Sequence, residues 1–220
     1  MTACNVWLQE TAGHILSDAA YYDSSGRIVQ IGSKVVIAHH LGIAYMPSGC
    51  GGHTRLHKHL LAAGPTGQQD GILCLPGIAA AMKAENLEGG VTGDDADVIL
   101  CAVTWHQALD QPVAFGVSTG GRQDLGAPGQ LHDLMGYTSP LVDLPHPVGS
   151  GLLDPALHGV SVLEAQRRAL EAVDGRALGW VGGYGEVTTV TREGITQARL
   201  IEWNDTVGEF PKHDSPGRAK

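Results

Sequence analysis

The stretch that decides the fold reads TACNVWLQETAGHILSD (residues 2–18), AAYYDSSGRIVQIGSK (19–34) and VVIAHHLGIAYMPSGCGG (35–52). Short runs of β-branched and aromatic residues alternate in it with Gly, Ser and Asp, which are the residues that form turns. This alternation predicts antiparallel hairpins over the first part of the chain. A glycine cluster that begins at Gly49 then precedes a segment with helical periodicity.

Thr2 stands directly after the initiator Met1 and gives the first indication of chemistry. A threonine hydroxyl is a poor nucleophile at neutral pH, so it needs a base beside it. When threonine is the first residue, its free α-amine can be that base, since this amine titrates near pH ~8. Because threonine has a small side chain, we expect Met1 to be removed. Retention of Met1 would leave Thr2 without a free amine.

Asp18 and Lys34 follow Thr2 at equal intervals. Asp18 lies 16 residues after Thr2, and Lys34 lies another 16 residues after Asp18. A lysine beside the hydroxyl would favour the neutral amine and stabilise developing negative charge, and a carboxylate would hold that lysine in place. Gly49 could supply a backbone N–H to an oxyanion. We therefore expect the side chains of Thr2, Asp18 and Lys34 to converge.

This pattern resembles a known family. The spacing of Thr2, Asp18 and Lys34 is similar to that of the catalytic threonine, aspartate and lysine of proteasome β-type subunits, within the N-terminal nucleophile (Ntn) hydrolase superfamily. In that family an apolar strand ends in the aspartate, and the corresponding segment here is HILSD at 14–18. Gly49 matches the glycine that follows the family's second hairpin, with one residue inserted.

Two downstream motifs extend the resemblance over most of the chain. VGSG at 148–151 resembles the family's Gly-Ser-Gly, whose serine assists the nucleophile, and this places that role on Ser150. The same serine could instead be a helix N-cap. GGYGEVTTVTREG at 182–194 resembles the closing strand hairpin of the family.

The resemblance implies an α+β fold built as a four-layer αββα sandwich, with two antiparallel sheets between helical layers. It assigns residues 1–205 to one proteasome-like domain and leaves 206–220 as a polar C-terminal tail, whose last part, 210–220, we expect to be disordered. It implies a threonine-type peptidase or amidase that cleaves amide bonds of a peptide or amide substrate through Thr2, without a cofactor or a metal. It also implies a homo-oligomer, such as a ring.

Two departures from the family pattern support a second hypothesis. The family has an aspartate and a serine shortly before its glycine pair, whereas this chain has ALGWV at 177–181, without an acid or a hydroxyl. The arginine that is usual two residues after the aspartate is Ala20 here. The alternative is therefore a non-catalytic, proteasome-like structural or binding component of an oligomeric assembly.

Periodicity and turn residues predict the elements of the whole chain. The predicted strands cover 3–9, 13–18, 27–31, 34–38, 41–46, 97–105, 112–118, 186–191 and 195–203, the predicted helices cover 53–63, 72–86 and 160–173, and 120–147 is loop-rich. Helices that alternate with antiparallel strand pairs favour sheets packed between helical layers.

The composition limits the function classes. A net charge of −9 argues against nucleic acid or an anionic membrane as a partner. No apolar run reaches the ~20 residues of a membrane span, and no secretory signal opens the sequence. The four cysteines are scattered without a Cys-x-x-Cys pair, which favours reduced thiols in a cytoplasmic protein.

Three other motifs offer competing chemistry. GVSTG at 116–120 matches the Gly-x-Ser-x-Gly nucleophile elbow, but a proline-rich loop follows it where a helix is required. His53 and His57 stand four residues apart on a predicted helix, as in a metal site, without an evident acidic ligand; an exposed polar helix face is the plainer interpretation. Cys4 would be a nucleophile only after longer processing, and its plainer interpretation is a small buried strand residue.

Overall fold

The computed structural model describes residues 2–49, 52–120, 125–139, 153–169, 181–212 and 218–219. Helices and sheets are both present, and the strand pairs run antiparallel. The predicted α+β class with antiparallel sheets is therefore confirmed.

The first sheet brings the beginning and the end of the chain together. Its strands, in spatial order, are β10 (Gly136–Ser139), β1 (Cys4–Leu8), β2 (Gly13–Asp18), β11 (Tyr184–Thr191), β12 (Gly194–Glu202) and β13 (Arg218–Ala219). β2 pairs with β1 through a short hairpin and with β11 on its other side. In this second pairing Gly185 lies opposite Asp18, so the end of β2 meets residues from far along the sequence.

The second sheet is formed by the middle of the chain. Its strands, in spatial order, are β5 (Val36–Ala38), β6 (Ile43–Ser48), β7 (Ile99–His106), β8 (Gln111–Ser118) and β9 (His132–Leu134). A separate short hairpin joins β3 (Ala20–Tyr22) to β4 (Ile28–Ile31). This hairpin leads from the end of β2 to the residues that precede β5.

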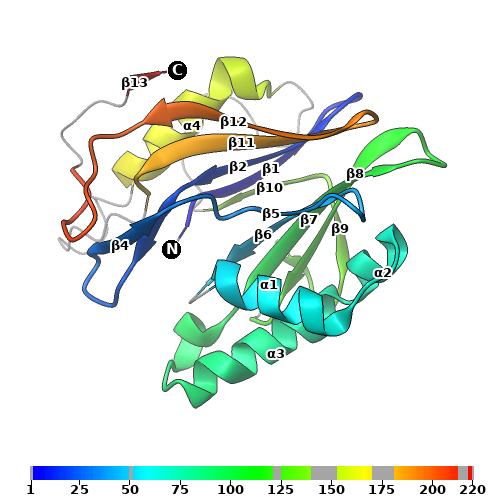
Figure 1. Cartoon of the computed structure of the whole chain (residues 1–220), viewed down its shortest axis with the longest axis horizontal. Helices are drawn as coiled ribbons and strands as arrows, with labels where there is room; N and C mark the ends of the chain where they lie inside the picture. The colour runs from blue at the N-terminus through cyan, green and yellow to red at the C-terminus, as the bar shows by residue number, and fades with distance from the viewer. Residues whose placement is uncertain are drawn as a thin grey trace.

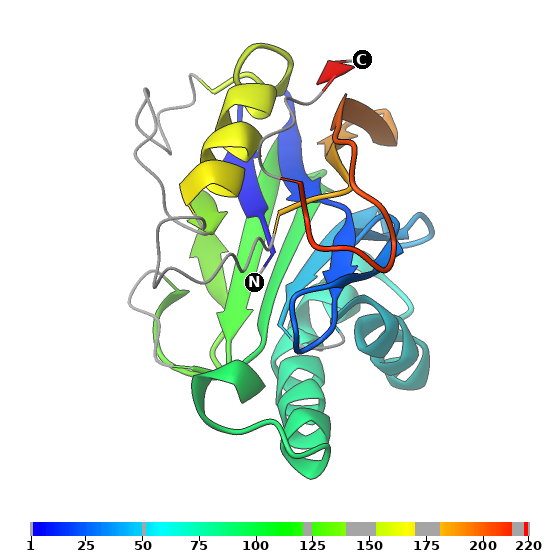
Figure 2. The same cartoon turned by 90° about the vertical axis from the view of Figure 1, so that its left-hand side faces the viewer.

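Helices lie against both sheets. α4 (Pro155–Ala169) lies over the first sheet, whereas α1 (Gly52–Ala63), α2 (Gln68–Leu73) and α3 (Leu75–Glu88) lie against the second sheet (Figures 1 and 2). A short 3-10 helix (Gly93–Ala96) precedes β7. In the part of the chain that the structure describes, no helix combines the length and the apolar character that a membrane span requires.

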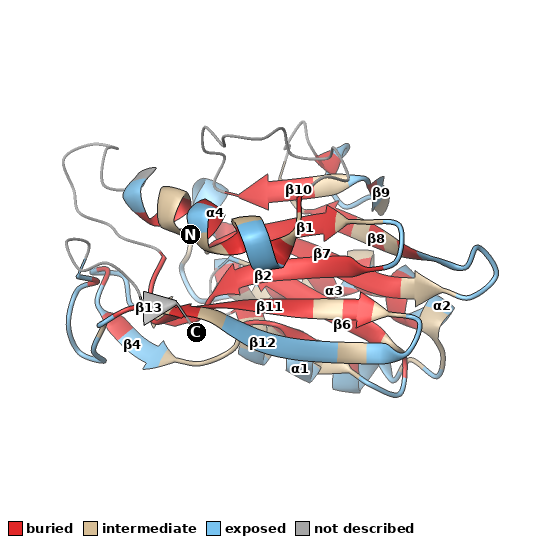
Figure 3. Ribbon diagram, turned by 90° about the horizontal axis from the view of Figure 1, so that it is seen from above, coloured by how far each residue is buried: buried red, intermediate tan, exposed pale blue. Residues whose placement is uncertain are grey.

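β2 is buried along its whole length (Figure 3), and its side chains alternate between two cores. Ile15 packs in the cluster that includes Ala44 and Val103 of the second sheet. Leu16 points the other way, into a cluster with Val162 of α4. Because successive residues of a strand face opposite sides, β2 needs apolar residues at both positions and delivers Asp18 into the interior.

The structure also corrects the predicted elements, and the largest differences are as follows. Part of the loop-rich stretch at 120–147 forms β9 and β10, which pair with β8 and β1. The predicted helix at 72–86 is divided between α2 and α3. The segment expected to be disordered is ordered in part, because β13 pairs with β12 and the backbone of Lys212 bonds to Arg167 and Asp205. The division into a domain at 1–205 and a tail stays a prediction.

His14 is a buried histidine on β2, the strand that lies between β1 and β11. One ring nitrogen contacts the Oγ1 of Thr189 and the other contacts the Oε1 of Gln9, each at 3.1 Å. Burial lowers the pKa of His14 to about 4, although the negative charge of Asp154 partly opposes this change. The native protein therefore prefers the neutral ring, and acidification must protonate it against burial.

We predict that His14 makes the fold sensitive to mild acid. Between pH 6.5 and pH 4 the unfolded chain binds the proton and the native protein does not, so the free energy of unfolding falls as the pH is lowered through this window. For this group alone the loss from pH 7 to pH 5 amounts to about 2 kcal/mol. Urea unfolding at both pH values should show the loss in wild type and a smaller loss in His14→Gln. The exposed His40→Gln is the control, and an equal loss in all three proteins would contradict the assignment.

Candidate functional site

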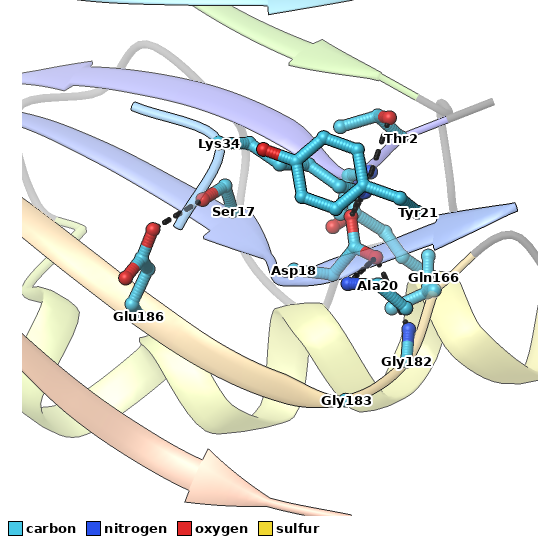
Figure 4. A network of polar contacts seen from close by, with 12 residues as sticks. Thr2, Ser17, Asp18, Ala20, Tyr21, Lys34, Gln166, Gly182, Gly183 and Glu186 are labelled. Atoms are coloured by element: carbon cyan, nitrogen blue, oxygen red, sulfur yellow. Dashed lines mark hydrogen bonds and ion pairs between the residues drawn. The ribbon is translucent and has the colours of Figure 1, made fainter. Parts of the chain in front are cut away.

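Asp18 is the centre of a buried polar network at the end of β2 (Figure 4). Its Oδ1 accepts hydrogen bonds from the Lys34 ammonium at 2.8 Å and from the Ala3 N–H at 3.0 Å. Its Oδ2 accepts from the N–H groups of Gly182 at 3.2 Å and Ala20 at 3.3 Å. A charged carboxylate that is buried away from water is tolerated only when its oxygens accept such hydrogen bonds. Four hydrogen bonds from separate segments therefore fix this side chain.

Lys34 lies on the connection between β4 and β5 and is only 4% exposed. Its Nζ donates to Asp18 at 2.8 Å and to the Oγ1 of Thr2 at 3.2 Å. The ammonium lies over the rings of Tyr21 and Tyr22, with its Nζ 5.6 and 5.8 Å from the two ring centroids. Aromatic faces attract a cation at this range. The ammonium is thus held between one carboxylate, one hydroxyl and two rings.

Burial lowers the pKa of Lys34, while the charge and hydrogen bond of Asp18 and the charge of Glu186 oppose this change. The buried ammonium is therefore more acidic than a lysine in water. A group whose pKa is shifted toward neutrality is better able to exchange protons near physiological pH.

Thr2 is half-buried and precedes β1. Its position is fixed through the neighbouring Ala3, whose N–H bonds to Asp18. The hydroxyl of Thr2 receives the hydrogen bond of Lys34, so a positive charge lies beside the oxygen that would carry negative charge in a nucleophilic attack. This geometry can lower the energy of a developing alkoxide.

The expected convergence of Thr2, Asp18 and Lys34 is confirmed by these contacts. Gly49 directly follows β6 with a φ of 127°, and a Cβ there would lie 2.8 Å from the carbonyl oxygen of Asp97, so only glycine fits. The role of Gly49 as an oxyanion donor stays a prediction. Ser150 lies outside the described residues, as does Met1.

A second carboxylate near Lys34 was not predicted from the sequence. Glu186 on β11 is 2% exposed and accepts hydrogen bonds from the hydroxyls of Ser33 at 2.5 Å and Ser17 at 3.3 Å. Burial raises the pKa of Glu186, and the serine hydrogen bonds oppose that change. An acid in the otherwise alternating segment GEVTTVT is the only sequence signal that could have indicated it.

A buried ion pair fixes the glycines that reach Asp18. The guanidinium of Arg167 on α4 binds the two carboxylate oxygens of Asp205 at 2.8 and 2.9 Å and the carbonyl of Val181 at 2.7 Å. Asp205 also accepts from the N–H of Gly183 at 2.8 Å. The next N–H back along the chain, that of Gly182, donates to Asp18. Arg167 and Asp205 therefore position the backbone that completes the site.

The competing motifs do not form sites in the described part of the chain. Ser118 of the Gly-x-Ser-x-Gly match is 1% exposed and donates to the carbonyl of Gly120. No group of three or more potential metal ligands is found among the described residues, which include His53 and His57. Cys4 is fully buried in β1.

The sheets and covering helices define a proteasome-like fold, and the solved structures that share it include two Anbu proteins. The Anbu (Gly-1) mutant from Hyphomicrobium sp. strain MC1 aligns with a TM-score of 0.57 at 11% identity, over 93% of this chain and 89% of that chain. Anbu (ancestral beta-subunit) from Yersinia bercovieri aligns with a TM-score of 0.58 at 12% identity, over 90% and 86%. No protein-family model and no curated protein matches the chain. At these identities the likeness shows the fold alone.

The assignment to proteasome β-type subunits and the Ntn hydrolase superfamily was therefore wrong. The matching structures named above are Anbu proteins, and no family model matches. The physical reason lies in the spacing on which the assignment rested. Intervals of 16 residues follow from the lengths of the β1–β2 and β3–β4 hairpins, so a shared fold is enough to produce them.

We predict that Asp205→Ala strongly destabilises the protein. The substitution leaves the buried Arg167 guanidinium without its carboxylate and leaves the Gly183 N–H without an acceptor. Removing one partner of a buried ion pair costs about 3–5 kcal/mol. The measurement is the free energy of unfolding from urea titration at pH 7.

The matched control is Glu209→Ala, which removes the exposed ion pair with Lys212. Exposed pairs contribute little, so this variant should unfold at the wild-type urea concentration. Equal stability of the Asp205→Ala variant and wild type would show that the ion pair of Arg167 and Asp205 does not support the fold.

Proposed function

We propose that the protein is a threonine-type amide hydrolase that cleaves a peptide or amide substrate through Thr2 after removal of Met1. The observation that carries the proposal is the Lys34 ammonium, which bonds to Asp18 at 2.8 Å and to the Thr2 hydroxyl at 3.2 Å. A buried lysine needs a partner for its charge, and Asp18 supplies it. Contact with a hydroxyl at the start of the chain has no comparable structural need.

In the first half-reaction the Oγ of Thr2 attacks the substrate carbonyl carbon while its proton passes to the free α-amine, directly or through a water. Lys34 stabilises the negative charge that develops on the attacking oxygen. The carbon–nitrogen bond then breaks, and the leaving amine takes the proton from the α-ammonium. The acyl group remains on Thr2 as an ester.

In the second half-reaction water replaces the amine. The α-amine of Thr2 takes a proton from water as the water oxygen attacks the ester carbonyl carbon. The ester bond breaks, the proton returns to the Thr2 oxygen and the carboxylic acid product leaves. We assign the backbone N–H of Gly49 to the carbonyl oxygen that becomes negative in both steps, and Ser150 to assistance of the nucleophile. The reaction as written requires no cofactor.

We propose that the layers form the αββα sandwich and that residues 1–205 make up the catalytic domain. The placement of α4 over one sheet and of α1 to α3 over the other supports this arrangement (Figure 1). We assign the protein to the cytoplasm, and the free thiols of Cys4 and Cys74 are compatible with a reducing compartment.

The second candidate is a non-catalytic component of an assembly. One observation favours it: the segment ALGWV at 177–181 supplies no acid or hydroxyl before the glycine pair. Residues 177–180 lie outside the described part of the chain. This candidate keeps the fold and the ion pair of Asp18 and Lys34 and requires no free amine on Thr2.

We predict that an epoxyketone probe, an electrophile for N-terminal threonine, labels Thr2 of the purified protein. Thr2→Ala should abolish labelling and turnover because the nucleophile is lost. Lys34→Ala should reduce the labelling rate by on the order of 10²-fold or more because the activating charge is lost. Mass spectrometry of the N-terminal peptide measures both.

The matched control is Thr54→Ala on the exposed face of α1, which should be labelled at the wild-type rate. Circular dichroism establishes that each variant is folded. A wild-type protein that begins at Thr2 and takes up no probe would favour the non-catalytic candidate.

We also predict that the protein forms a homo-oligomer through its helices. Leu61 of α1 and Leu73 of α2 are 72% and 61% exposed, and the small Ala80 of α3 is exposed too, so these helices offer apolar and small side chains to the helices of a second copy. Sedimentation velocity at micromolar concentration should show a species larger than the monomer, and Leu61→Glu with Leu73→Glu should dissociate it. A monomer alone in the wild type would refute the assembly and leave the catalytic proposal intact.

A further inference from the structure

Glu186 is a buried acid that the proposed reaction does not use. It lies on β11, is 2% exposed and faces β2 and the connection between β4 and β5. Its carboxylate accepts from the hydroxyl of Ser17 (Figure 4), from the hydroxyl of Ser33 and from the backbone N–H of Lys34. A buried acid is costly unless its hydrogen bonds and charge are matched, so its position beside Lys34 needs an explanation.

Ser33 links Glu186 to the backbone of Lys34. Its hydroxyl donates to Glu186 at 2.5 Å and accepts from the N–H of Val35 at 3.2 Å and the amide of Gln197 at 3.0 Å. A hydroxyl has one donor and two acceptor positions, so all of them are used. The carbonyl of Ser33 in addition accepts from the Tyr21 hydroxyl at 2.8 Å. The residue before Lys34 is therefore fixed on every side.

The charges around Glu186 also bear on Lys34. Asp18 uses both oxygens on four donors, whereas Glu186 adds a second negative charge that raises the pKa of Lys34 against the effect of burial. On the other side, Arg199 of β12 lies 4.0 Å above the ring of Tyr184, which shares β11 with Glu186. The groups that face Glu186 are thus Ser17 and Asp18 of β2, Tyr21 of β3, Ser33 and Lys34 of the connection, and Tyr184 and Arg199.

We propose that Glu186 is the positioning residue of the site, which holds the Lys34 ammonium against Thr2 through Ser33 and the Lys34 N–H. The inference rests on the proposed function, because the position of the ammonium matters only if Thr2 reacts. It supplies a supporting acid from β11, after the glycine pair, whereas the segment ALGWV at 177–181 before that pair contains none.

The test compares Glu186→Ala with Glu186→Gln. The amide oxygen of glutamine can still accept from Ser33, but it carries no charge. The labelling rate of Thr2 with the epoxyketone should fall at least ~10-fold in Glu186→Ala and stay within ~3-fold of wild type in Glu186→Gln, as expected for a residue that acts by hydrogen bonding. Glu88→Ala, which removes an exposed acid at the end of α3, is the control and should keep the wild-type rate.

A second readout does not depend on catalysis. The titration midpoint of the Lys34 ammonium, followed by NMR of its ¹⁵Nζ and assigned with Lys34→Arg, should be lower in both Glu186 variants by on the order of one pH unit. Unchanged midpoints in both variants, a wild-type labelling rate in Glu186→Ala, or no recovery of rate in Glu186→Gln would each overturn the proposal. If wild-type Thr2 takes up no probe, the proposed function fails, and the midpoints alone then decide whether Glu186 acts on Lys34.

Discussion

The buried ion pair of Lys34 and Asp18 is the constraint on which the rest of the structure depends. Both side chains are nearly inaccessible to water, at 5% and 0% exposed, and their charges are 2.8 Å apart. Two buried charges are tolerated only when geometry and hydrogen bonding repay their lost hydration. The backbone donors come from the residue before β1, the β2–β3 junction and the residues before β11. The first and last parts of the chain must meet to supply them.

Such a pair is weak evidence for stability, because apolar residues of similar volume often replace buried ion pairs without loss. The proposed function explains the pair by the ammonium that it holds next to the Thr2 hydroxyl. The pair of Arg167 and Asp205 differs from the pair of Lys34 and Asp18. It contacts the backbone of Gly183 and Lys212 and so holds main-chain segments in place. Lys212, in the segment 206–220 that was predicted to be a polar C-terminal tail, is thereby connected to the site through this second pair.

Local patterns predicted the parts of the fold that depend on neighbours in sequence. The convergence of Thr2, Asp18 and Lys34 follows from hairpins with short turns, which fix where each strand ends. Glu186 could not be found in this way, because it lies 153 residues from Ser33 in the sequence and meets it only when β11 pairs with β2. β9 and β10 were missed because they are short and take their strand character from the partner strand. The family was misjudged because the hairpin spacing reports the fold and not the lineage.

The central claim is that a free α-amine on Thr2 lies beside the ammonium of Lys34. The most direct measurement is the N-terminal peptide of the purified protein, identified by mass spectrometry after proteolysis. The account predicts a peptide that begins at Thr2, with an intact mass lower than that of the full sequence by one methionine residue. A protein that retains Met1 throughout would have no free amine on Thr2 and would contradict the account.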